Sequence, residues 1–208
     1  IRINEMSSPH LDRVIGKVTI TPKAITSVEV NLTTDGSHIW RPFAPNAEIK
    51  VEIEKKGWNW VGHGYFDANF GTRALEKDFS YWTWSRLPCN EGSVAFYDAD
   101  RRNEGPLKVS LKFHSDGRVE EITPPPESRL SRSLWWVKRR TRSDIGYQPT
   151  QVKHMLDTPF YTRSAIKTKI HGEETIGVHE AVDLNRFSSP LIKPMLAVRV
   201  PRTTRWKP

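Results

Sequence analysis

Residues 107–122 read LKVSLKFHSDGRVEEI, and this stretch decides the fold class. Its first half alternates apolar with polar residues, the apolar ones being Leu107, Val109, Leu111 and Phe113. A period of two is typical of a β-strand with one buried and one solvated face. The dipeptide Asp116-Gly117 is a turn signal, and a second short run follows it at 119–122. The stretch therefore predicts an antiparallel hairpin.

The same period recurs along the chain, for example at Ile49, Val51 and Ile53. Turn signals at 35–36 and 56–57 separate such runs, whereas helical spacing is scarce beyond a short turn at 74–79. About a dozen short strands separated by turns favour an all-β sandwich or barrel.

Three consecutive prolines at 124–126 interrupt the strand pattern. Because proline cannot donate to a central ladder, residues 123–128 are predicted to be a linker. Residues 1–122 would then form a first β-domain and residues 129–208 a second, smaller one. The sequence starts inside an apparent strand without an initiator Met, so an N-terminal part of the first domain is expected to be missing.

The amino-acid composition excludes some classes of protein and indicates the kind of partner that this one binds. The chain has 208 residues, of which 37% are hydrophobic and 27% charged, as in a folded globular protein. Its single cysteine, Cys89, excludes a disulfide-stapled scaffold and has no persuasive base beside it. No apolar run approaches the roughly 20 residues that a bilayer-spanning helix needs. The net charge of +8 attracts polyanions, either nucleic acid or an anionic lipid surface.

Residues 58–71, WNWVGHGYFDANFG, contain the highest density of aromatic and titratable side chains in the chain. In strand geometry His63, Tyr65 and Asp67 share one face. Gly62 and Gly64 share the other and indicate a close approach by neighbouring atoms. The alternative interpretation is a bulged strand whose aromatic side chains fill a barrel.

Upstream, His38 and Trp40 are also two residues apart. If both strands line one interior, they bring an imidazole and an indole to the phenol of Tyr65 and the carboxyl of Asp67. A carboxyl among aromatic rings resists ionising, so we expect a raised pKa and a general acid at Asp67. The alternatives are an exposed His38 beside a turn, Trp40 as ordinary core, and Asp67 as a turn former that bonds Asn69.

A second aromatic stretch, WTWSR at 82–86, puts Trp82, Trp84 and Arg86 on one strand face. It is either a further pocket wall, with Arg86 holding a carboxylate, or plain core with a stacked guanidinium. The histidines are too scattered to indicate a metal site.

The main basic cluster also contains Trp135 and Trp136; its cations are Arg129, Arg132, Lys138, Arg139, Arg140 and Arg142. Nucleic-acid binding, a membrane-facing patch and a solvated strand face all fit this pattern. The C-terminal Arg199, Arg202, Arg205 and Lys207 add charge near Trp206.

The order of these motifs resembles the carotenoid 1,2-hydratase (hydroxyneurosporene synthase) family. The stretches that carry the resemblance are SSPH at 7–10, WRPFAP at 40–45, GHGYFDAN at 62–69, Gly71, LE at 75–76, WTWSR at 82–86, EAVDLNRF at 180–187, ML at 195–196 and VPR at 200–202. They span nearly the whole chain.

The resemblance implies two consecutive lipocalin-like antiparallel β-barrels and cofactor-free addition of water to the terminal 1,2 double bond of acyclic carotenoids such as lycopene. The family's proposed catalytic positions map onto His38, Trp40, Tyr65 and Asp67. We expect substrate contacts from Trp60, His63, Asn69, Trp82, Trp84 and Arg86. No cofactor or metal is expected.

The expected partners are an acyclic carotenoid, an anionic membrane on the cytoplasmic side and the family's further N-terminal segment. Nucleic acid is not expected, because only the basic cluster favours it. Two other functions stay open at this point: a lipocalin-like cyclase of the Diels–Alder type, and a non-enzymatic carrier of an apolar polyene.

Overall fold

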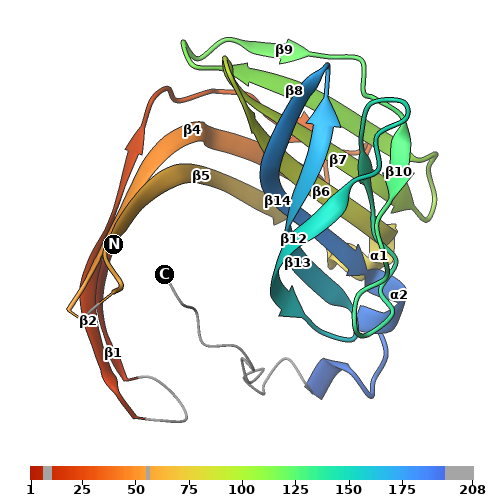
Figure 1. The fold of residues 1–208 in the computed structure, drawn as a ribbon. Helices are drawn as coiled ribbons and strands as arrows, with labels where there is room; N and C mark the ends of the chain where they lie inside the picture. The colour runs from red at the N-terminus through yellow and green to blue at the C-terminus, as the bar shows by residue number, and fades with distance from the viewer. Residues whose placement is uncertain (7–10, 55–56, 195–208) are drawn as a thin grey trace.

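The computed structural model describes residues 1–6, 11–54 and 57–194. The motifs at 7–10, 195–196 and 200–202, and the basic residues near the C-terminus, lie outside this part. The regular secondary structure of the described residues is almost entirely β-strand in curled antiparallel sheets, which confirms the prediction of an all-β, barrel-like fold (Figure 1).

A five-stranded sheet takes the N-terminal strands and bends through a wide arc (Figure 1). Its strands are β1 (Arg2–Met6), β2 (Arg13–Pro22), β3 (Val30–Asn31), β4 (His38–Ile53) and β5 (Trp60–Gly71). The predicted alternation at Ile49, Val51 and Ile53 falls in β4. The long strands β4 and β5 pair with two register shifts near Ala44, and such bulges bend a strand.

A seven-stranded antiparallel sheet forms the rest of the body. In spatial order its strands are β12 (Thr150–Asp157), β13 (Tyr161–Ile170), β14 (Glu173–Asp183), β6 (Phe79–Cys89), β7 (Gly92–Arg101), β8 (Leu107–His114) and β9 (Val119–Glu121). The predicted hairpin at 107–122 is confirmed as β8 and β9, with Gly117 at a φ of 93° in the turn.

The helical content of the described residues is small. α1 (Leu75–Asp78) lies within the predicted helical turn at 74–79, and α2 (Leu184–Phe187) follows β14. The side chain of Asp183 caps α2 by accepting a hydrogen bond from the backbone N–H of Arg186.

Two apolar cores lie on opposite faces of the seven-stranded sheet. The first packs Trp40 and Leu32 of the N-terminal region against side chains that include Phe79, Tyr97 and Phe113. The second is made by Leu87, Val94, Phe96, Leu130, Ile166 and Ile170. The first core joins the two large sheets and therefore positions the aromatic residues singled out in the sequence.

The predicted division at 123–128 stays a prediction, but the seven-stranded sheet takes strands from both sides of it. β14 pairs with β6 along 178–183 and 81–86, so backbone hydrogen bonds connect the two predicted domains. Residues 127–128, predicted to belong to the linker, begin β10 (Glu127–Arg129), which pairs with β11 (Arg140–Arg142). Their polar, proline-free sequence lets them join a ladder, whereas the three prolines before them cannot donate to one.

A buried ion pair anchors this region to the sheet. Arg142 Nε donates to Asp98 Oδ2 over 3.0 Å, a second guanidinium nitrogen donates to Asp98 Oδ1, and Nη1 donates to the carbonyl of Pro125. Both partners are nearly inaccessible to solvent. The proline segment is thus fixed to β7 by a charged side chain.

Candidate active site

The carboxyl of Asp67 is the centre of a compact hydrogen-bonded group. Trp40 on β4 donates its indole N–H to Asp67 Oδ2 over 2.8 Å, and the Tyr65 hydroxyl donates to the same oxygen over 2.8 Å. The Trp40 N–H also lies 3.2 Å from the Tyr65 oxygen. The structure therefore brings together three of the four predicted catalytic residues.

The other oxygen, Asp67 Oδ1, accepts no hydrogen bond within the described part of the chain. A neutral carboxyl accepts through its carbonyl oxygen and carries its proton on the other one. If Asp67 is neutral, Oδ2 is the acceptor and Oδ1 bears a proton that is available for transfer.

Aromatic rings surround this group from the opposite sheet. The Trp84 ring centroid lies 5.1 Å from that of Tyr65, and the Tyr97 ring lies 5.7 Å from that of Trp40. The Arg86 guanidinium lies 5.6 Å from the Tyr65 ring centroid and donates to the carbonyl of Pro45. Burial, followed by the negative charge of Asp67, raises the pKa of Tyr65, so its phenol stays neutral and can donate.

Trp84 carries an unusual polar atom. Its indole Nε1 is buried and has no hydrogen-bond partner in the described part of the protein. Leaving a buried donor unpaired costs about 1–3 kcal/mol. A ligand or water oxygen at this position would relieve that cost.

His38 belongs to a different set of contacts. Its Nε2 lies 2.7 Å from Asp78 Oδ2, its ring packs on Phe79 at 5.2 Å, and its side chain is almost fully buried. Arg73 also binds Asp78 through two nitrogens and, with His38, holds the pKa of that carboxyl below its usual range. The structure gives His38 no hydrogen bond to Trp40, Tyr65 or Asp67.

The six predicted substrate contacts divide between two environments. Trp82, Trp84 and Arg86 lie in or beside the core between the sheets. Trp60, His63 and Asn69 are exposed on β5. At Gly64 on the same strand, an added Cβ would come within 2.5 Å of Ile49 Cγ1, which agrees with the close approach predicted for the glycines.

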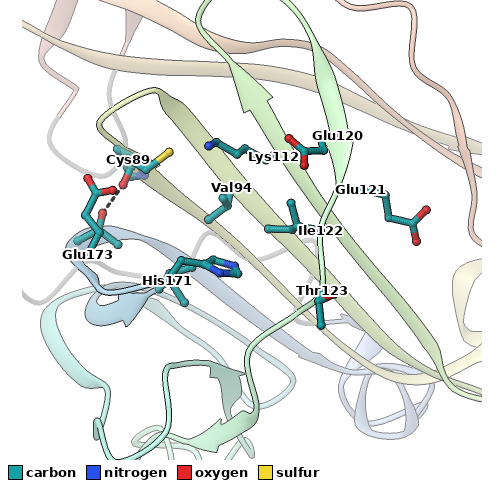
Figure 2. A pocket seen from close by; sticks show the side chains of 12 residues that line it. Cys89, Val94, Lys112, Glu120, Glu121, Ile122, Thr123, His171 and Glu173 are labelled. Atoms are coloured by element: carbon teal, nitrogen blue, oxygen red, sulfur yellow. Dashed lines mark hydrogen bonds between the residues drawn. The ribbon is translucent and has the colours of Figure 1, made fainter.

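Asp67 lines neither of two cavities in the structure. One of about 530 Å³ is lined by Cys89, Val94, Lys112 and His171 among others (Figure 2). Two further lining residues are joined by a hydrogen bond, which the Thr175 hydroxyl donates to the Pro88 carbonyl. Burial raises the pKa of the Cys89 thiol, which favours the unreactive neutral form. A smaller cavity of about 150 Å³ includes His63 and Arg86. Among the described residues, no group of three or more His, Cys, Asp or Glu side chains is arranged to hold a metal ion.

Two acidic residues near the site were not among the residues predicted from the sequence. Asp78, the partner of His38, lies 40 residues further along the chain and gave no local signal. Glu180 lies on the same strand face as the apolar residues Val178 and Val182. A charged residue at an apolar position of a strand was the sequence signal that could have identified it.

The fold and the site together define a class: an all-β protein that holds a carboxyl, an indole and a phenol in an aromatic interior between curled sheets. The chain belongs to the carotenoid hydratase family, because the family model "Carotenoid hydratase CrtC" matches residues 1–208. The resemblance seen in the sequence is thereby confirmed.

Relatives of known identity agree with this assignment. An acyclic carotenoid 1,2-hydratase from Cereibacter sphaeroides is 55% identical over 207 residues, which are 99% of this chain and 74% of that protein. A second, from Rhodobacter capsulatus, is 52% identical over 96% of this chain and 71% of its own length. The same enzyme from Thiocapsa roseopersicina is 39% identical over 97% of this chain and 50% of its own length. No solved structure matches the chain.

These relatives indicate that the protein is an enzyme of the hydro-lyase class, as the sequence predicted.

Proposed function

We propose that this protein adds water to the terminal 1,2 double bond of an acyclic carotenoid without a cofactor, by acid catalysis through a tertiary carbocation. The observation that carries the proposal is the Asp67 carboxyl, which receives two hydrogen bonds on Oδ2 and, from the residues that the structure describes, none on Oδ1. The hydratase relatives support the substrate class.

The first step is proton transfer from neutral Asp67 to C2 of the terminal isoprene unit. The bond from Oδ1 to hydrogen breaks, a C2–H bond forms, and C1 is left as a tertiary cation. The rings of Trp40, Tyr65 and Trp84 stabilise this cation through their faces, an interaction worth about 2 kcal/mol when water is excluded. The Trp40 and Tyr65 donors stabilise the carboxylate that remains.

The second step is attack of water on C1. The indole N–H of Trp84, which has no partner among the described residues, supports a bound oxygen atom near the rings. We propose that His38 takes the proton of this water. The carboxylate of Asp78 at Nε2 fixes the imidazole tautomer and leaves Nδ1 as the acceptor. The reaction then balances, with hydrogen on C2, hydroxyl on C1 and one proton to return to Asp67.

Incubation with lycopene or neurosporene, followed by mass analysis, tests the proposal. We expect a product heavier than the substrate by one water. An isomer of unchanged mass would indicate a cyclase, and recovery of bound, unaltered polyene would indicate a carrier.

We further propose that the protein collects its substrate from an anionic membrane surface on the cytoplasmic side. The support is a tip between β10 and β11, residues 131–138, at which Leu134, Trp135 and Trp136 are 83%, 50% and 68% exposed. The exposed Arg132 and Lys138 flank these side chains. Aromatic rings beside cations suit the interface between headgroups and acyl chains.

Three of the other arginines of the basic cluster serve other contacts. Arg139 and Arg142 are buried, and Arg140 pairs with Asp100 and stacks on Tyr81. The proposed membrane surface therefore consists of the 131–138 tip and not of the whole cluster. Among the residues that the structure describes, none of the helices could span a membrane.

A further inference from the structure

The smaller cavity lies where the five-stranded sheet meets the turns at one end of the seven-stranded sheet. Its volume is about 150 Å³, and its lining includes Lys23 just after β2, His63 on β5, Arg86 on β6 and Asn90 in the turn between β6 and β7. No Asp or Glu is among the described residues that line it. One water occupies about 30 Å³ in the liquid, so the cavity has room for several waters or for one small oxyanion.

Arg86 brings a buried charge to this cavity. The residue is only 8% exposed. Its Nε donates to the carbonyl of Pro45 over 2.8 Å, and neither terminal nitrogen has a hydrogen-bond partner in the described part of the chain. All 24 Asp and Glu residues lie in that part, and none of them forms an ion pair with Arg86. Because buried charges are normally paired, the guanidinium lacks a counter-charge from the protein.

The other groups around the guanidinium are neutral. The Tyr65 ring centroid lies 5.6 Å from it, and this ring offers only its aromatic face. Burial lowers the pKa of Arg86, and Tyr65 and Cys89 oppose that shift. Burial also raises the pKa of the Tyr65 phenol and of the Cys89 thiol, so both are uncharged at neutral pH. An anion from solution would therefore supply the compensation that the chain does not.

The remaining lining adds positive charge and hydrogen-bond donors. Lys23 and His63 are exposed residues from two other segments of the first sheet region, and the backbone N–H of Lys23 donates to the Asn46 carbonyl over 2.9 Å. Ser115, after β8, contributes a hydroxyl. An amine, an imidazole and a guanidinium around one small space attract anions. The planar fork of arginine matches two oxygens of a phosphate or carboxylate group.

We propose that this cavity binds a small oxyanion of the phosphate class, which the terminal nitrogens of Arg86 hold and to which Lys23 and His63 add positive charge. The ligand is chemically distinct from an uncharged carotenoid, so the inference does not depend on the hydration proposed above. A free phosphate ion and the phosphate of a lipid headgroup share this chemistry.

The test is equilibrium dialysis of the full chain against radiolabelled inorganic phosphate, with sodium chloride holding the ionic strength constant. We expect saturable binding of one phosphate per chain. A hydrogen bond between charged groups contributes enough that Arg86→Gln should weaken this binding roughly 10- to 100-fold. Lys23→Gln changes an exposed side chain of the same cavity and should weaken it by a smaller factor.

Arg118→Gln is the matched control. It removes the same charge from an exposed arginine that pairs with Asp116 and does not line the cavity, so its affinity for phosphate should equal that of the parent. Unfolding midpoints of all variants show whether each is folded. If Arg86→Gln does not fold, Lys23→Gln still tests the site.

Competition by glycerol phosphate identifies the source of the phosphate group. Stronger competition than by inorganic phosphate would favour a lipid headgroup, and weaker competition would favour the free ion; both results support the site. The inference is overturned if the parent binds no phosphate saturably, because the cavity then holds water alone. It is also overturned if the folded cavity variants bind with parental affinity, or if Arg118→Gln loses as much affinity as they do.

Discussion

Trp40 on β4 donates its indole N–H to Asp67 on β5 over 2.8 Å, although the Cα partner of Trp40 across the two strands is Asn69. The register shifts between Arg41 and Ala47 bend this part of the sheet beside the contact. A bulge commonly changes the direction of a side chain. Here it lies beside the site at which the Trp40 indole and the Tyr65 hydroxyl donate to the same oxygen of Asp67. The site thus lies beside a strand irregularity, and the contact itself is the diagonal one that same-face neighbours on paired strands allow.

Replacing Trp40 with Phe tests the hydrogen bond separately from the ring. The variant keeps an aromatic face and removes one of the two donors to Asp67 Oδ2. A hydrogen bond to a charged group contributes about 1.5–3 kcal/mol, so we expect the hydration rate to fall roughly 10- to 100-fold. Tyr65→Phe removes the other donor and should give a loss of the same order. Parental rates in both variants would show that neither donor assists the acid.

We expect the buried ion pair of Arg142 and Asp98 to contribute to the free energy of unfolding. Asp98→Asn leaves a buried guanidinium without its counter-charge, and breaking such a pair costs about 3–5 kcal/mol. The free energy of unfolding from denaturant titration should fall by this amount. Asp116→Asn, which alters a solvent-exposed pair with Arg118, is the matched control and should change it by less than about 1 kcal/mol. Equal effects would contradict the role given to the buried pair.

The fully buried His179 predicts a pH dependence of stability. Its Nε2 bonds the Arg140 carbonyl, and burial lowers the pKa of the imidazole to about 4. Between pH 6.5 and 4 the unfolded chain binds a proton that the folded chain does not. Stability should therefore fall as pH decreases through this window, by roughly 1.4 kcal/mol per pH unit from this group.

His179→Gln removes that titration. Denaturant unfolding of parent and variant at pH 7 and pH 5 should give curves whose stability difference changes with pH, with the variant losing less on acidification. A difference that stays constant between the two pH values would contradict the assignment.

The exposed aromatic side chains of the 131–138 tip lead us to expect binding to lipid. Trp135→Ser combined with Trp136→Ser removes two exposed rings and leaves the adjacent cations in place. In flotation with anionic vesicles, we expect the parent to float and the double variant to float less. Vesicles of neutral lipid should retain less of the parent, because the charge contribution is absent. A parent that binds neither kind of vesicle would contradict the docking proposal.

The sequence predicted those parts of the fold and site that follow from the alternation of side chains along a strand, a period of two. That period placed Tyr65 and Asp67 on one face and defined the hairpin of β8 and β9. It gave no information on which strands pair over long distances. The pairing of β14 with β6 across the prolines was therefore missed.

The pattern of charged residues in the sequence gave less information than the period of two. It did not show which charged side chains are buried and which are exposed. Arg142 belonged to an apparent surface cluster, yet its partner Asp98 lies 44 residues away and holds it in the interior. The contact of His38 with Asp78 and the interior placement of Glu180 likewise depend on strand packing that no local pattern encodes.

The most direct test of the central claim is hydration of lycopene in deuterated water by the parent and by Asp67→Asn. If Asp67 delivers the proton, the parent should place one deuterium on C2 and a hydroxyl on C1. The asparagine variant, folded with an unchanged unfolding midpoint, should form almost no product. Hydration by Asp67→Asn at the parental rate would contradict the account.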